Sequence, residues 1–386
     1  EVDELLTRGV EEVIERAHLR EALLSGRRLR IKLGIDPTSP KLHIGRAIPL
    51  RKLRAFQDLG HQVVFIVGDF TGIIGDTSDK EAERPMLSEQ IIKENITTYF
   101  KQAAQVLDGK KAEMHYNSSW LKKLGFAEVG RMADAFGLHE FEARENIAKR
   151  LKAGSRVSVR ELLYPLMQGY DSVAVKADVE VGGTDQKFNL LAGRAIQKLY
   201  GQEPQDIMTF SLLEGLDGRK MSSSWGNTVN LTDEPNEMFG KIMSLKDELV
   251  ERYFSLCTDL EKDEIAARLQ KGPRDAKLAL AHEIVRLYHG EKEADRARDE
   301  FIKVFSEKRA PTDVPEVTVP EGSYTLIDLL VAAKLAQSRG EARRLIVQGG
   351  VKVNGKRKND PAEKVAVRTG TQLQVGPRRF LRLLVE

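Results

Sequence analysis

The sequence predicts an α/β fold in which a parallel sheet is interrupted by a helical insertion and followed by two smaller domains. A short apolar run, Leu29–Leu33, precedes a helical pattern at Arg46–Leu59, and the continuous apolar run His61–Asp69 comes next. A strand, a helix and a second strand within about forty residues are typical of a βαβ unit. Further along, the periodicity is helical over long stretches, and the end of the chain is small and basic.

The composition is that of a globular protein with two or three domains. Of 386 residues, 41% are hydrophobic and 31% are charged. No apolar run approaches the roughly 20 residues that a membrane span requires. Residues 1–30 are charged and unlike a secretion signal, and Cys257 is the single cysteine, which excludes a disulfide framework and a thiolate metal cluster. We therefore expect a cytoplasmic protein without a membrane segment.

Charge is distributed unevenly along the chain. Tyr324–Glu386 carries thirteen Lys and Arg against five Asp and Glu, a balance of +8, whereas the whole chain carries +3. A small basic domain on a mildly acidic body indicates a nucleic-acid partner. A solvated basic face without a partner is the alternative interpretation.

The loop Gly34–Arg46 is the first candidate site. It joins the carboxyl end of the first strand to the N-terminus of a helix, where unpaired N–H groups and the helix dipole favour a phosphate. His43 stands at the helix entrance and is able to hydrogen-bond a phosphate oxygen, although a structural role is the alternative. Gly45 lets a flat ring lie against the backbone. A second Gly-rich loop, Asp69–Asp76, follows the next strand.

The helical period of 3.6 residues marks two further stretches. Glu1–Ser25 is expected to form a helix packed on the body, and Leu87–Leu163 a helical insertion between two halves of the sheet. Beyond the insertion, the strand, turn and helix arrangement repeats, with a strand at Val173–Val181, a turn at Gly182–Gln186, a helix at Lys187–Tyr200 and a strand at Asp206–Leu213.

The domain boundaries follow from these patterns. Residues 1–225 are expected to form the sheet-containing domain, with the insertion at about 87–163, and residues 226–307 an all-helical domain. Residues 308–323 contain three prolines and no amphipathic stripe, so they are expected to be a linker. Residues 324–386 are expected to fold into two short helices followed by strands.

Five stretches, in a fixed order, resemble one family. Pro37–Arg46 resembles the HIGH signature of class I aminoacyl-tRNA synthetases, and Lys220–Ser224 resembles their KMSKS signature. Tyr164–Asp171 and Gly182–Asn189 are similar to the tyrosyl-tRNA synthetases of bacteria, and Tyr324–Val353 resembles their S4-like RNA-binding domain. The resemblance covers essentially the whole chain. It implies a Rossmann-type catalytic domain, a helical anticodon-binding domain and an S4-like domain.

The resemblance implies a reaction in two steps. Tyrosine attacks the α-phosphate of ATP to give tyrosyl-adenylate and pyrophosphate, and the tyrosyl group then moves to the 3′-terminal ribose of tRNA(Tyr). The implied partners are L-tyrosine, ATP with Mg²⁺, tRNA(Tyr) and a second copy of the chain that binds through the insertion. The amino acid supplies its own carboxylate nucleophile, so the protein chiefly positions reactants and stabilises phosphate charge. The alternatives are a tryptophanyl-tRNA synthetase and a non-catalytic RNA-binding protein on the same scaffold.

The resemblance places catalytic residues in both signatures and in the polar loop between them. Arg46 stands where the family usually has a second histidine and adds a charge. Ser223 stands where the family has a second lysine and removes one. Lys80 and Arg84 match positions that reach pyrophosphate, or else they are solvated loop charges. The full implied catalytic set is Thr38, His43, Arg46, Lys80, Arg84, Lys220 and Ser223.

The implied ligand contacts fall into three groups. Those for ATP are Gly34, Pro37, His43, Gly45, Gly183, Asp185, Lys220, Met221, Ser222 and Ser224. Those for tyrosine are Lys32, Asp36, Asp76, Tyr164, Gln168, Asp171 and Gln186, where Asp171 faces the phenolic hydroxyl. Those for tRNA are Arg339, Arg343, Arg344, Lys352 and Lys356. The sequence shows no set of metal ligands, which is expected if Mg²⁺ is carried by ATP.

Overall fold

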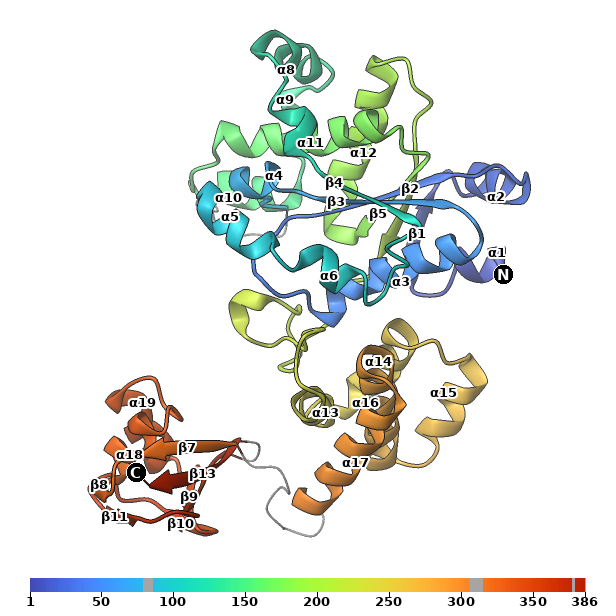
Figure 1. Ribbon diagram of the computed structural model, residues 1–386. Coiled ribbons are helices and arrows are strands. Elements are labelled where there is room, and N and C mark those ends of the chain that lie inside the picture. The colour runs from blue at the N-terminus through green and yellow to red at the C-terminus, as the bar shows by residue number, and fades with distance from the viewer. Residues whose placement is uncertain (79–85, 306–314, 377–378, 386) are drawn as a thin grey trace. The chain divides into compact units, whose positions relative to one another are not determined.

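The computed structural model describes residues 1–78, 86–305, 315–376 and 379–385 (Figure 1). The chain forms two compact units: the first comprises residues Glu1–Asp233 and Ser244–Leu280, and the second comprises Glu234–Met243 and Ala281–Glu386. Among the described residues, no helix has both the length and the apolar character needed to cross a membrane. The domain boundaries given above remain predictions.

A six-stranded sheet forms the centre of the first unit. Its strand order is β1-β6-β5-β2-β3-β4, and every neighbouring pair is parallel except β1 with β6. The chain runs from β2 outward through β3 to β4 and then returns to place β5 on the other side of β2. The strands are β1 (Val10–Ile14), β2 (Arg30–Ile35), β3 (Gln62–Val67), β4 (Ala112–Tyr116), β5 (Val179–Gly183) and β6 (Asp206–Phe210).

Helices cover both faces of this sheet, with α11 and α12 on one face and α3 and α6 on the other (Figure 1). The predicted helices at Arg46–Leu59 and Lys187–Tyr200 are confirmed as α3 and α12. The helices of this unit are α1 (Val2–Leu5), α2 (Arg16–Leu24), α3 (Ile44–Asp58), α4 (Thr71–Ile74), α5 (Glu89–Ile96), α6 (Tyr99–Ala103), α7 (Ser118–Leu121), α8 (Phe126–Ala133), α9 (Leu138–Glu142), α10 (Glu145–Lys152), α11 (Val159–Val175), α12 (Lys187–Leu199), α14 (Val250–Cys257) and α15 (Lys262–Leu269).

The prediction of one helix at Glu1–Ser25 is wrong in its middle, where β1 forms instead. Gly9 and Glu15 have positive φ angles of 67° and 64°, and these left-handed residues interrupt a helix. The five residues between them pair antiparallel with β6, an edge that would otherwise be open.

Two predictions around the insertion are also corrected. The insertion contains β4, which extends the sheet beyond β3. The stretch predicted as a strand at Val173–Val181 begins as the end of α11. Ser158 and Glu161 form a capping box that starts this helix, and Lys176 ends it in the left-handed conformation. The strand β5 starts at Val179 and includes both glycines that were expected to form a turn.

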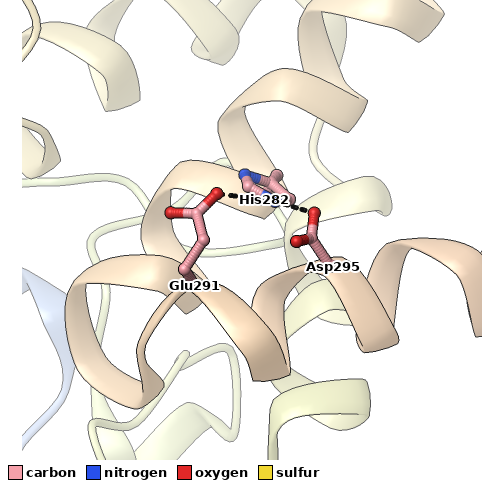
Figure 2. A group of neighbouring side chains, drawn as sticks. All are labelled: His282, Glu291 and Asp295. Carbon is pink, nitrogen blue, oxygen red and sulfur yellow. Dashed lines mark hydrogen bonds and ion pairs between the residues drawn. The ribbon is translucent and has the colours of Figure 1, made fainter.

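In the second unit, α13 (Pro235–Met243) packs against α17 (Glu291–Phe305), and ion pairs join the end of α16 (Pro273–His289) to α17. Figure 2 shows His282 of α16 facing two carboxylates of α17, Asp295 at 3.0 Å and Glu291 at 3.8 Å. Asp295 also pairs with Arg298 at 3.1 Å, and Glu291 with Arg286 at 3.9 Å. These charges are already balanced by arginine, so we interpret the group as an interhelical contact.

The C-terminal part of the second unit contains a five-stranded sheet of order β10-β9-β12-β13-β7 and a β11-β8 pair. The predicted linker is wrong at its end, because Glu316–Val319 is strand β7; its valines alternate with polar residues, and Val317 and Val319 join the core. The predicted helices and strands are confirmed. The elements are β8 (Gly322–Thr325), α18 (Leu326–Ala332), α19 (Arg339–Val347), β9 (Val351–Val353), β10 (Lys356–Lys358), β11 (Lys364–Val367), β12 (Gln372–Val375) and β13 (Arg379–Val385).

Candidate active site

A cavity of about 490 Å³ opens at the carboxyl ends of β2 and β5. These strands are neighbours, and the chain leaves them toward opposite sides of the sheet, which is where open α/β sheets bind ligands. Most residues predicted for ATP and tyrosine lie around this one cavity. Its predicted lining residues are Gly34, Asp36, Thr38, His43, Gly45, Arg46, Asp76, Tyr164, Gln168, Asp171, Gly183, Asp185, Gln186, Lys220, Met221, Ser222 and Ser223.

The remaining predicted residues are placed differently. Lys32 does not line the cavity; its side chain is fully buried beneath it. Pro37 is also buried and outside the lining, with its carbonyl bound by Asn95. Lys80 and Arg84 lie outside the described residues, as does the side chain of Ser224.

The two signature segments are held together by backbone hydrogen bonds within the first unit. The N–H of Ile44 donates to the carbonyl of Val229 at 2.9 Å, and the N–H of Leu231 donates to the carbonyl of Leu42 at 2.9 Å. The residues flanking His43 are therefore paired with the segment that follows the second signature. This pairing makes the two signatures opposite walls of one cavity.

His43 is a neutral hydrogen-bonding group. Burial lowers its pKa to about 3, and Arg46 and Lys220 add smaller effects in the same direction. Its Nδ1 is buried without a hydrogen-bond partner among the described residues. A Cβ on Gly45 would come within 3.1 Å of this nitrogen and 3.5 Å of the Met221 sulfur. Glycine at position 45 therefore keeps the surface between the two signatures open.

We expect His43→Asn to slow ATP–pyrophosphate exchange by roughly 10²-fold, the cost of removing one preorganised donor from a transition state. Because the pKa of His43 is about 3, its ring stays neutral throughout pH 6–8. The pH profile of the variant should therefore keep the shape of the parent profile between these values. If the parent rate changed with pH between 6 and 8 and the rate of the variant did not, a neutral His43 would be contradicted.

The second signature is fixed from beneath by Asn227, which was not predicted. Its Oδ1 accepts from the N–H of Ser222 at 2.8 Å, and its Nδ2 donates to Asp217 at 2.8 Å and to the Lys220 carbonyl at 3.1 Å. Lys220 reaches across to Asp185, with 3.1 Å between Nζ and Oδ2. Two predicted ATP contacts, Asp185 and Lys220, thus lie side by side.

Asp171 lies in the floor of the cavity and is buried. Trp120 Nε1 donates to its Oδ1 at 2.7 Å, and Asn117 Nδ2 donates to its Oδ2 at 3.2 Å. Burial raises the pKa of Asp171 to about 7, although Lys32, Trp120 and Asn117 lower it. Each oxygen of a carboxylate has more than one acceptor site, so Asp171 is able to accept a further hydrogen bond from a ligand hydroxyl.

Helix α11 presents three predicted residues to the cavity. Tyr164, Gln168 and Asp171 are spaced by four and three residues, which places them on one helical face. The Tyr164 hydroxyl donates to Asp36 Oδ2 at 2.8 Å, and Thr71 donates to Asp36 Oδ1 at 2.7 Å. Burial raises the pKa of Asp36 to about 6.

A second carboxylate completes this polar side of the cavity. Gln186 Nε2 donates to Asp76 Oδ2 at 2.7 Å, and the Ser78 hydroxyl donates to Asp76 Oδ1 at 2.6 Å. The cavity therefore has carboxylates at one side suited to a cation, a buried carboxylate in its floor, and His43, Arg46 and Lys220 toward the signatures.

Asn117, Trp120 and Thr71 are functional candidates that the sequence did not reveal. Asn117 follows β4 directly, at the same sheet edge as the predicted site. Its signal was its place after a strand, and that strand was not recognised. Thr71 begins α4, a short helix inside the stretch Asp69–Asp76 that was expected to be a Gly-rich loop, and the sequence assigned this residue no role.

Residues 24–306 match the family described as tRNA synthetases class I (W and Y), and residues 307–373 match the tyrosine–tRNA ligase SYY-like C-terminal domain. The chain is 48% identical to a tyrosine–tRNA ligase of Moorella thermoacetica over 391 residues, covering 98% of this chain and 94% of that protein. The chain belongs to the tyrosine–tRNA ligase family. A tyrosine–tRNA ligase of Thermotoga maritima is 45% identical over 386 residues, with 98% and 96% coverage.

A solved structure of the same family has a similar fold. The C-terminally truncated mitochondrial tyrosyl-tRNA synthetase of Aspergillus nidulans matches with a TM-score of 0.66 and 25% identity, over 79% of this chain and 94% of that one. The predicted α/β fold with a class I catalytic domain is confirmed. Membership of the tyrosine–tRNA ligases argues against a tryptophanyl-tRNA synthetase, because the similar proteins are named tyrosine–tRNA ligases.

Proposed function

We propose that this chain activates L-tyrosine with ATP and transfers the tyrosyl group to tRNA(Tyr). The observation that carries the proposal is the position of Asp171, a buried carboxylate in the floor of a cavity whose opposite walls are the two signatures. A tyrosine side chain inserted into this cavity would donate its phenolic hydroxyl to Asp171. The phenyl ring of phenylalanine has no donor and would leave Asp171 without that partner.

The polar side of the cavity suits the α-ammonium group of tyrosine. Asp76 supplies a negative charge, and the Tyr164 hydroxyl, which donates to Asp36, keeps lone pairs for a cation. Gln168 and Gln186 line the same region. With the ammonium held here and the phenol at Asp171, the carboxylate of tyrosine points toward the signatures.

The signature walls suit the phosphates of ATP. The neutral ring of His43 would donate a hydrogen bond to a phosphate oxygen. Arg46 and Lys220 would stabilise the negative charge that grows on the transferring and leaving phosphates. Gly45 and Met221 bound the region proposed for adenine, and Gly183 and Asp185 the region proposed for ribose. Mg²⁺ is proposed to enter with ATP, held by phosphate oxygens rather than by a dedicated set of protein ligands.

The proposal is tested by tyrosine-dependent exchange of pyrophosphate into ATP, run in parallel with tryptophan, phenylalanine and no amino acid. We expect exchange with tyrosine alone, and aminoacylation of tRNA(Tyr) in the second assay. Exchange that responds to tryptophan would overturn the assigned substrate. Binding of tRNA without exchange would favour a non-catalytic RNA-binding protein.

The C-terminal domain is proposed to bind phosphates of tRNA. Arg339, Arg343 and Arg344 lie exposed on α19, and Lys352 and Lys356 lie on the adjoining strands β9 and β10. Arg339 also pairs with Asp328, so part of its charge is already balanced.

We expect the double change Arg343→Gln and Arg344→Gln to weaken tRNA binding and to flatten its dependence on salt. Each lost phosphate contact should reduce the slope of log K against log salt by about one. Titration of tRNA(Tyr) between 50 mM and 200 mM salt, roughly the range in which such contacts dominate, measures this slope. Tyrosine-dependent exchange needs no tRNA and serves as the control that should not change.

The insertion is proposed to form a homodimer interface. Among the described residues, large apolar side chains are exposed there, including Phe126 at 95%, Val159 at 73% and Leu138 at 61%. Exposed apolar side chains that gather into one patch mark a protein interface, and the proposal is that these side chains belong to such a patch. Sedimentation of the full chain would show a dimer, and a monomer at micromolar concentration would contradict it. Since tRNA is the proposed substrate, we place the activity in the cytoplasm.

A further inference from the structure

The loop that carries the first signature is held from one side by α5 and α6 of the insertion. Asn95 Nδ2 donates to the Pro37 carbonyl at 2.8 Å, and the Tyr99 hydroxyl donates to the Ser39 carbonyl at 2.7 Å. Gln102 donates to the Pro40 carbonyl at 2.9 Å and accepts from the N–H of Leu42 at 2.7 Å. Tyr99 and Gln102 are three residues apart on α6, the spacing of one helical face, and Asn95 lies near the end of α5.

Tyr99 also contacts a side chain of the cavity wall. Its hydroxyl oxygen accepts from Arg46 Nη1 at 3.2 Å while its hydrogen is donated to Ser39. The ring is fully buried, so this hydroxyl has little freedom to move. Arg46 is held further by the Asp36 carbonyl and the Thr38 hydroxyl, both at 3.2 Å.

Ser39 extends this network to the opposite wall. Its Oγ lies 3.2 Å from the Oγ of Ser223, within hydrogen-bond distance. The contacts therefore run from Arg46 through Tyr99 and Ser39 to Ser223. These end points are the two positions at which the chain departs from the HIGH and KMSKS patterns, one by gaining a charge and the other by losing one.

We propose that Tyr99 is a positioning residue that sets the Arg46 guanidinium and the Ser39 backbone for binding the phosphates of ATP. The proposal rests on the proposed function, in which Arg46 faces those phosphates. An arginine side chain has many rotamers, and a guanidinium fixed before ATP binds loses less freedom on binding. Small displacements of a positioning group are costly because transfer of the adenylyl group from ATP to the tyrosine carboxylate depends on alignment.

The substitution Tyr99→Phe removes the hydroxyl and keeps the buried ring. We expect kcat/KM for ATP in the exchange reaction to fall roughly three- to tenfold, the value of one net hydrogen bond. The KM for tyrosine should stay unchanged, because Tyr99 lies on the phosphate side. The matched control is Tyr324→Phe, which removes a hydroxyl bound to the Pro320 carbonyl in the second unit and should leave exchange unchanged.

The decisive experiment compares the full-length parent, Tyr99→Phe, Arg46→Ala and the double variant. If Tyr99 acts through Arg46, its substitution should have a much smaller effect once Arg46 is alanine. An equal effect of Tyr99→Phe in both backgrounds would show a general structural role and overturn the proposal. Exchange at the parent rate in Tyr99→Phe or in Arg46→Ala would also overturn it.

The affinity of the same four proteins for ATP, measured by calorimetry, gives a readout that does not depend on activity. It should show the same coupling between positions 46 and 99. A parent protein that binds ATP with this coupling but shows no tyrosine-dependent exchange would contradict the proposed function and leave the role of Tyr99 supported. Uncoupled affinities would overturn the role of Tyr99 even in an active enzyme.

Discussion

Replacing Asp171 by asparagine is expected to lower kcat/KM for tyrosine by roughly 10²- to 10³-fold. The first loss is the charged acceptor for the phenolic hydroxyl, worth about 1.5–3 kcal/mol. The second arises inside the protein, because the carboxylate accepts from both Trp120 and Asn117. An asparagine amide has a single acceptor oxygen, so one of these buried donors would face an N–H group. An unpaired buried group costs about 1–3 kcal/mol more.

Asn117 is unable to relieve this conflict cheaply by turning its amide. Its Oδ1 already accepts from the N–H of Phe70 at 3.0 Å, and its Nδ2 also donates to Thr71 at 2.9 Å. The amide of Asn117 is therefore fixed with Nδ2 toward Asp171. Preference for tyrosine over phenylalanine should fall along with activity, and it is measured as the ratio of kcat/KM values in the exchange reaction.

The same substitution should change the dependence on pH. The pKa of Asp171 is about 7, raised by burial from its ordinary value of 3.8. Below pH 7 the protonated carboxyl loses an acceptor, so kcat/KM for tyrosine should decline as pH falls through 7 in the parent protein. The asparagine variant should lack this limb, although Asp36, with a pKa of about 6, remains free to contribute one. A limb near pH 7 that persists in the variant would assign it to another group.

Parts of the fold could be predicted because the hydrophobic pattern of the segment itself indicates its secondary structure. β3 is an apolar run that is buried on both faces, and such runs indicate parallel strands. β4 has no such signal: Ala112–Tyr116 is a partly exposed strand with polar residues, stabilised by pairing with β3. Missing this edge strand also hid Asn117 and Trp120, which lie just beyond its carboxyl end.

The site was predictable where residue type and chemistry coincide and unpredictable where only the fold brings residues together. Glycine, histidine and lysine in the two signatures carry a phosphate-binding pattern. Asn117 and Trp120 are 54 and 51 residues from Asp171 in sequence, and only the packing of the insertion places them there. The network of Tyr99 with Arg46 was hidden for the same reason. Lys32, which the resemblance implied as a tyrosine contact, has a fully buried side chain that does not line the cavity.

Replacing Lys32 by methionine is expected to lower the free energy of unfolding of the first unit by about 3–5 kcal/mol, the cost of leaving one member of a buried ion pair alone. Lys32 and Glu180 face each other on adjacent strands, 2.9 Å apart, with 0% and 1% of their side chains exposed. Lys32 also donates to the Gln168 carbonyl and to Ser172, both at 2.8 Å, so its three donors are satisfied.

The reason for the cost is the carboxylate that remains. Glu180 would keep its hydrogen bonds from Gln168, Ser172 and Gln205 but would lose its only cation among the described residues. A double change of Lys32→Met and Glu180→Gln removes both charges together, so it should recover at least half of the loss.

Urea unfolding followed by tryptophan fluorescence measures this, because both tryptophans, Trp120 and Trp225, lie in the first unit. The matched control is Lys187→Met, which breaks a lysine–glutamate pair with Glu12 that is 47% and 43% exposed. An exposed pair is worth about 0–1 kcal/mol, so this variant should unfold close to the parent midpoint. Equal losses of unfolding free energy for Lys32→Met and Lys187→Met would mean that burial does not determine how much the Lys32–Glu180 pair contributes to stability. A double variant that is less stable than Lys32→Met would mean that the hydrogen bonds of Glu180, rather than its charge, stabilise the sheet.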